Sequence, residues 1–163
     1  MFELKRLMLQ EPRLTLAVAE SVTCGRIQVR IGLIAGASSF FHGGITTYNL
    51  EQKMRHLGVS KETAEPVNSV SMEVAEQMAR GACVFFGAKL GLATTGFAEP
   101  DVKRANPVPF AWWALAHDLG DGRTALQSGM VECPGLSRAV AQEAIATAAT
   151  RALLQYLHQF RGR

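Results

Sequence analysis

A short apolar run that ends in two polar residues is the feature that most constrains the fold. Residues 14–19 are apolar except for Thr15, and Glu20 and Ser21 follow at once. A short apolar segment without strict alternation is typical of a strand that is covered on both faces. From Thr23 to about Ile34 the apolar residues recur at helical spacing, which predicts a helix directly after the strand. A buried strand followed by a helix favours an α/β fold.

The rest of the chain continues this alternation of strands and helices. We expect further helices at residues 3–10, between 49 and 58, at 71–86 and at 137–160, and further strands at 43–48, 89–95, 110–117 and 124–132. The early alternation predicts parallel strands, and the close spacing of the last two strands predicts an antiparallel hairpin. We therefore predict a three-layer α/β/α sandwich with a mixed, mostly parallel five-stranded sheet. The chain of 163 residues has the length of a single domain, so we expect one domain that covers residues 1–163.

Charge and cysteine spacing argue against several functions. The net charge is only +3 and no basic run is present, so we expect no nucleic-acid partner. Three widely spaced cysteines and four histidines without metal-ligand spacing predict neither a disulfide framework nor a metal site. No apolar run is long enough for a membrane span. The amino terminus carries charges of both signs and does not resemble a signal peptide, so we expect a cytoplasmic protein.

Polar residues stand where several predicted strands end. In such sheets ligands bind at the carboxyl ends of the strands, which here include Ser21, Tyr48 and the pair Thr95-Gly96. Ser21 also precedes a helix start, whose free amides could stabilise a developing oxyanion. It is therefore a candidate nucleophile. The alternative is that Ser21 or Thr23 only caps the helix.

Lys53 is a candidate base for that serine. It is predicted in the first turn of a helix, where the helix dipole disfavours a cation. If the amine is also buried, its pKa falls, and a neutral amine can activate a serine. Tyr48, near the end of the preceding strand, has a phenol that could carry a proton. The alternatives are an exposed surface lysine and a half-buried strand aromatic.

Three stretches carry a resemblance to one family. They are Ala19-Glu20-Ser21-Val22-Thr23-Cys24-Gly25, then Ser38-Ser39-Phe40-Phe41-His42-Gly43-Gly44-Ile45-Thr46-Thr47-Tyr48-Asn49 with Lys53 and Leu57-Gly58-Val59 beyond it, and Thr95-Gly96-Phe97-Ala98. The first resembles the AESCTGG motif of the CinA carboxy-terminal-domain family, the nicotinamide-nucleotide amidases. The second and third are similar to that family's G-G-V-x-x-Y block and to the start of its glycine-rich TGIAGPGGG loop. The resemblance covers nearly the whole chain.

The resemblance implies hydrolysis of nicotinamide mononucleotide to nicotinate mononucleotide and ammonia, so the expected partner is a small nucleotide substrate. It implies Ser21 as nucleophile, Lys53 as its base and Tyr48 as an assisting proton carrier. We expect the substrate-binding positions at Thr23, Cys24, Gly25, Gly44, Thr95 and Gly96, with the amides near Cys24 and Gly25 holding the oxyanion. No metal or cofactor is needed, and family members are commonly homo-oligomers, which we expect here also.

The chain departs from the family pattern in the parts that would hold the substrate. Cys24 replaces a glycine, and we expect it to be a packed thiol rather than a nucleophile. Residues 99–104 replace the glycine-rich loop, and Glu99 and Asp101 would repel a phosphate that they faced. Arg138 is shifted by one position, which would turn it about 100° away. A catalytically weak or silent member that binds a nucleotide-like ligand or a protein partner is the alternative function.

Overall fold

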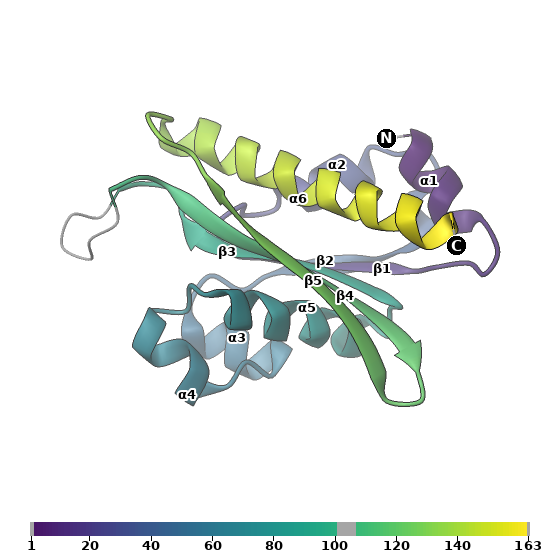
Figure 1. Cartoon of the computed structure of the whole chain (residues 1–163), viewed down its shortest axis with the longest axis horizontal. Helices are drawn as coiled ribbons and strands as arrows, with labels where there is room; N and C mark the ends of the chain where they lie inside the picture. The colour runs from purple at the N-terminus through teal and green to yellow at the C-terminus, as the bar shows by residue number, and fades with distance from the viewer. Residues whose placement is uncertain (1, 101–106, 163) are drawn as a thin grey trace.

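A β-sheet lies between two layers of helices in this computed structural model, which describes residues 2–100 and 107–162 (Figure 1). One face is covered by α1 (Phe2–Leu9), α2 (Arg26–Gly32) and α6 (Arg138–Arg161). The other is covered by α3 (Leu50–Leu57), α4 (Lys61–Ala64) and α5 (Met72–Phe86). Two 3₁₀ turns, Ala37–Ser39 and Glu65–Val67, complete the helical segments described.

The sheet contains β1 (Leu16–Glu20), β2 (Phe41–Thr46), β3 (Leu90–Phe97), β4 (Phe110–Gly120) and β5 (Arg123–Glu132). The strand order is β2-β1-β3-β4-β5. β1 pairs in parallel with β2 and β3, whereas β4 pairs antiparallel with both β3 and β5. Four strands therefore run in one direction and β4 runs against them. The predicted three-layer sandwich with a mixed, mostly parallel sheet is confirmed.

The two faces of the sheet carry different cores. Leu16 and Val18 of β1 belong to a cluster with residues of α1, α2 and α6. Ala17 and Ala19 belong to a second cluster that is rich in α5 residues. All residues of β1 are buried, as expected for a strand covered on both faces. The ends of β1 are therefore held firmly, including the end that carries Ser21.

Several element boundaries differ from those predicted. α2 begins at Arg26 rather than near residue 23 because Cys24 and Gly25 have φ values of 49° and 92°, which a right-handed helix excludes. β2 covers residues 41–46 rather than 43–48, and its register with β1 shifts between Leu16 and Ala17. The predicted helix start at Asn49 and end at Gly58 are confirmed, since both residues cap α3.

The two ends of the described chain lie together, as Figure 1 shows. Arg161, at the end of α6, donates hydrogen bonds of 3.0 Å to the carbonyl oxygens of Leu7 and Pro12. α6 has 24 residues, so it extends about 36 Å from these contacts to Arg138. No helix in the described ranges has the length and apolar character that crossing a membrane requires.

Candidate active site

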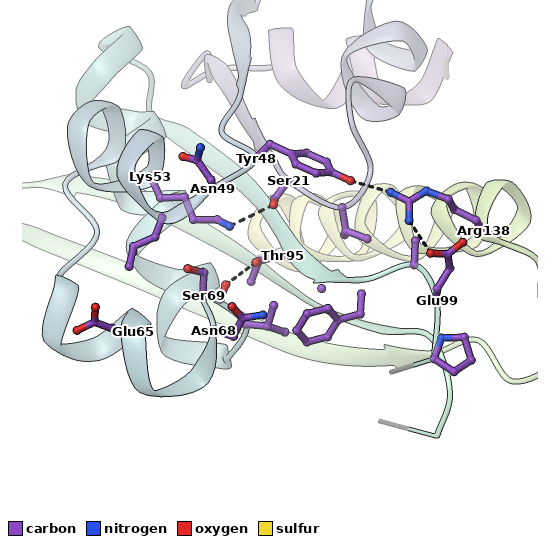
Figure 2. A pocket seen from close by; sticks show the side chains of 17 residues that line it. Ser21, Tyr48, Asn49, Lys53, Glu65, Asn68, Ser69, Thr95, Glu99 and Arg138 are labelled. Carbon is purple, nitrogen blue, oxygen red and sulfur yellow. Dashed lines mark hydrogen bonds and ion pairs between the residues drawn. The ribbon is translucent and has the colours of Figure 1, made fainter. Parts of the chain in front are cut away.

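The carboxyl ends of β1, β2 and β3 open into a pocket of about 520 Å³ (Figure 2). The residues on which its chemistry depends are Ser21, Tyr48, Lys53, Glu99 and Arg138, and all five line it. They come from the loops after β1, β2 and β3 and from the first turns of α3 and α6. The sheet therefore brings together residues that are far apart in the sequence.

Ser21 and Lys53 meet in the wall of this pocket. The Lys53 Nζ donates a hydrogen bond of 3.2 Å to the Ser21 Oγ. Both residues are buried, with 6% and 2% of their surface exposed. The Ser21 amide donates to the carbonyl of Thr94 on β3 (3.0 Å), and the Asn49 side chain caps the helix that carries Lys53. Both side chains are thus held by ordered backbone.

The Lys53 amine is short of polar partners. Burial lowers the pKa of Lys53 from 10.5 to about 8, because a cation loses hydration in the pocket wall. Within residues 2–100 and 107–162, no carboxylate forms an ion pair with it. With that pKa, roughly a tenth of the amine is neutral at pH 7. A neutral amine next to a hydroxyl can accept the hydroxyl proton.

The Tyr48 phenol is directed toward Arg138, not toward Lys53 (Figure 2). The Arg138 Nη2 donates a hydrogen bond of 2.7 Å to the Tyr48 hydroxyl oxygen. Its Nη1 donates to the Glu99 Oε2 at 3.1 Å. The expectation that the shifted Arg138 turns away from the pocket is wrong, because α6 begins at Arg138 itself and its side chain reaches the pocket.

Thr95 and Gly96 also line the pocket, at the end of β3. The Thr95 hydroxyl donates a hydrogen bond of 2.7 Å to the Ser69 carbonyl and so fixes the segment that precedes α5. Gly96 leaves room for the neighbouring strand, since a Cβ there would lie 2.4 Å from the Phe110 carbonyl oxygen. Both positions therefore shape the wall of the pocket.

The other four predicted substrate-binding residues do not line the pocket. The buried Thr23 hydroxyl is 2.7 Å from the Thr94 hydroxyl. Cys24 is exposed, so the packed thiol expected there is wrong. A Cβ on Gly44 would meet the Gln28 side chain at 2.5 Å, which places Gly44 beneath α2. The amides of Cys24 and Gly25 already bond to other groups, the Ser21 carbonyl (3.2 Å) and the Glu20 carboxylate (3.0 Å).

Glu20 is the important residue that the sequence reasoning missed. It is completely buried, and its carboxylate accepts from the amides of Gly25, Ile27 and Gln28 at 3.0, 3.2 and 2.9 Å. Glu20 therefore satisfies the start of α2, and neither Ser21 nor Thr23 caps it with its side chain. An acidic residue shortly before a helix start is the signal that could have identified this role.

Metal ligands do not gather anywhere in the part of the chain that the structure describes: it has no group of three histidine, cysteine, aspartate or glutamate residues placed to hold an ion. The Ser21 and Lys53 pair is in any case a set of proton-transfer groups, not a ligand set. Asp101, the second carboxylate expected to repel a phosphate, lies outside the described residues.

The family model of the CinA C-terminal domain matches residues 3–157. A CinA-like protein of Shewanella sediminis is 38% identical over 143 residues, covering 87% of this chain and 32% of that protein. A CinA-like protein of Chlorobium limicola is 35% identical over 156 residues, covering 95% of this chain and 36% of that protein. The chain thus spans about a third of the length of these curated relatives.

Solved structures agree with the sequence comparisons. The competence-damaged protein (CinA) superfamily protein of Escherichia coli superposes with a TM-score of 0.77 at 27% identity, covering 93% of this chain and 84% of that chain. A CinA superfamily protein of Klebsiella pneumoniae 700603 has the same fold, with a TM-score of 0.83 at 24% identity over 97% of this chain and 95% of that chain.

Fold and site together define a three-layer α/β/α protein with a buried serine and lysine at the carboxyl edge of a mixed sheet. The chain belongs to the CinA family, and its residues 3–157 correspond to the family's C-terminal domain.

Proposed function

We propose that this protein is an amidohydrolase that converts the carboxamide of nicotinamide mononucleotide, or of a related small amide, into a carboxylate and ammonia. The observation that carries the proposal is the 3.2 Å contact between the Ser21 Oγ and the Lys53 Nζ, together with the lowering of the Lys53 pKa to about 8. A serine next to a largely desolvated lysine is a known arrangement for acyl transfer. CinA family membership is compatible with it.

In the first half of the reaction, the neutral Lys53 amine accepts the Ser21 proton while the Oγ attacks the carboxamide carbon. The tetrahedral intermediate then breaks its C–N bond, and the Lys53 ammonium returns the proton to the departing nitrogen. Ammonia leaves and an ester on Ser21 remains. In the second half, Lys53 removes a proton from water, which attacks the ester, and the carboxylate product leaves as Ser21 regains its proton.

The oxyanion of this intermediate needs a donor other than the two amides first expected. The Cys24 and Gly25 amides are engaged elsewhere. Within the described residues, the amide of Val22 has no hydrogen-bond partner, and Val22 lines the pocket directly after the nucleophile. We assign the oxyanion to this amide. Because the Tyr48 phenol faces Arg138, we assign the proton transfers to Lys53 and regard Tyr48 as a group that positions Arg138.

The test is ammonia release from nicotinamide mononucleotide by the purified protein and its variants. We expect Ser21→Ala and Lys53→Ala to abolish release and to keep the native circular-dichroism spectrum. The matched controls are Ser39→Ala and Lys61→Ala, two exposed residues outside the pocket, which should keep full activity. Below pH 8, kcat/KM should rise about tenfold per pH unit and then level off, because the neutral amine is the active form. Equal rates in the wild type and Ser21→Ala would refute the proposal.

A second candidate is a member that binds a nucleotide-like ligand with little or no turnover. It is favoured by the ion pair between Arg138 and Glu99 at the end of the pocket, because a guanidinium already paired with a carboxylate is less available to a substrate. This candidate predicts thermal stabilisation by nicotinamide mononucleotide without ammonia release. The same ammonia assay distinguishes the two candidates, since fast turnover of nicotinamide mononucleotide by the wild type excludes the second.

A further inference from the structure

Arg138 is the cation at the outer end of the pocket, opposite the end that Lys53 occupies (Figure 2). Its guanidinium donates to the Glu99 carboxylate and to the Tyr48 hydroxyl. About half of the Arg138 side chain (47%) and 63% of the Glu99 side chain remain exposed. An ion pair with this exposure is weak and exchanges with solvent readily. Arg138 is therefore available to another anion, but only in competition with Glu99.

A phosphate monoester is a ligand group that matches the donor geometry of such a guanidinium. Two parallel N–H donors match two phosphate oxygens, and the charges are opposite. In this chain the Glu99 Oε2 already accepts a hydrogen bond from the Arg138 Nη1, one of the donors that a phosphate would use. A phosphate that approaches Arg138 must displace the carboxylate and then remain near its negative charge. The displacement and the charge repulsion both oppose binding of the phosphate, and neither changes the contacts made by the rest of the ligand.

We infer that Glu99 is a specificity-determining residue that weakens the binding of phosphate-bearing ligands at Arg138 relative to ligands that lack the phosphate. The inference rests on the proposed function in one respect, namely that the pocket binds the amide substrate. It assigns to this chain a reduced contribution of the phosphate to the binding of a nucleotide substrate, set by one carboxylate.

The experiment measures binding without turnover. Ser21→Ala protein and the Ser21→Ala/Glu99→Gln double variant are titrated by calorimetry with nicotinamide mononucleotide and with nicotinamide riboside, which differ by the phosphate. The matched control is Ser21→Ala/Glu143→Gln. Glu143 also pairs with arginines, Arg26 and Arg30, but does not line the pocket.

We expect Glu99→Gln to lower the Kd of the mononucleotide about fivefold, the upper value for an exposed ion pair, and to leave the Kd of the riboside unchanged. The gain should shrink at about 0.5 M salt, because screening weakens exposed charges. Glu143→Gln should change neither Kd. In the variants that retain Ser21, the effect should occur in KM rather than in kcat.

Three results would overturn the inference: a mononucleotide Kd that Glu99→Gln leaves unchanged or raises, an equal gain for the riboside, or no binding of the mononucleotide to any variant. A raised Kd would mean that Glu99 holds Arg138 in a binding position instead of competing for it. Failure of the proposed reaction gives a different result, in which the binding pattern holds but the protein with Ser21 intact releases no ammonia.

Discussion

At the scale of single residues, the unusual group is the Lys53 amine. It is 98% buried, since only 2% of the residue is exposed, and Ser21 supplies its hydrogen bond. A pKa lowered from 10.5 to about 8 corresponds to a cost of about 3 kcal/mol for keeping the charged form in the folded state. Burial of the charged Lys53 amine thus lowers the free energy of unfolding, and the same burial makes the amine a better base at neutral pH.

We expect Lys53→Met to make the protein more stable at pH 7 while it removes activity. The unbranched methionine fills the same space without a charge, and the gain is about 2 kcal/mol after about 1 kcal/mol for the lost Ser21 bond. The gain has a definite pH range. Below about pH 8 Lys53 is protonated in both the folded and the unfolded wild type, so the full cost of the buried charge applies. Between pH 8 and 10.5 the folded protein releases the Lys53 proton while the unfolded chain keeps it, and the cost of the buried charge falls.

Urea unfolding of the wild type and Lys53→Met at pH 7 and at pH 10 measures this difference. Lys61→Met, which replaces an exposed lysine, is the control and should change the free energy of unfolding little at either pH. A Lys53→Met protein that is less stable than the wild type at pH 7, or whose advantage persists at pH 10, would contradict the cost assigned to the buried amine.

The sequence identified which residues approach one another but not all of their partners. Ser21 is predicted at the site because it follows β1, and Lys53 because it lies in the first turn of the helix after β2, whose end shares one edge of the sheet with that of β1. The roles of Cys24 and Gly25 were predicted less well. Their positive φ values turn the chain sharply between β1 and α2, and their amides point at groups inside the turn. Such orientations depend on dihedral angles that residue types do not determine.

At the scale of elements, the start of α2 depends on one side chain. The Glu20 carboxylate accepts hydrogen bonds from three amides, one in the turn before α2 and two in the first turn of α2. It therefore satisfies donors that several capping groups usually share. α2 has only seven residues, and a helix this short gains little from its own propensity. Its position, and with it the position of Ser21, depends on Glu20.

We expect Glu20→Gln to lower the free energy of unfolding by about 3 kcal/mol, because buried amides lose a charged acceptor and gain an amide group that repels them. Urea unfolding measures the loss, and faster amide hydrogen exchange in residues 25–32 should accompany it. Glu51→Gln is the control: Glu51 stands in the first turn of α3 but is exposed, so its loss should be within about 0.5 kcal/mol. Equal losses in the two variants would show that Glu20 does not hold the start of α2.

At the scale of the whole molecule, one sheet joins the two helical layers. Neighbouring residues of β4 face opposite layers: Trp113 packs against the cluster that includes α1, α2 and α6, and Trp112 packs against the cluster around α5. The layered architecture was predictable from the sequence because residues 14–19 form an apolar run, as in a strand covered on both faces, and helices with apolar stripes alternate with the strands. The side chains at the pocket rim were less predictable, because Arg138 reaches the pocket only since α6 begins at that residue, and the sequence does not fix a helix start to one position.

These two tryptophans allow a test of whether the layers unfold together. Trp112→Phe leaves Trp113 as the reporter of one layer, and Trp113→Phe leaves Trp112 as the reporter of the other. We expect the urea midpoint from fluorescence to equal the midpoint from circular dichroism in each variant, since both cores share the strands. A fluorescence transition that precedes the circular-dichroism transition in one variant only would mean that its layer unfolds separately.

The contact of Arg161 with the last turn of α1 and the loop after it has a practical consequence. Because both ends of the described chain lie near this contact, at the end of α6 opposite Arg138, a linker joined there leads away from the pocket. The protein can therefore be immobilised on a bead or sensor chip through its amino or carboxyl end, and the pocket then faces the flowing solution.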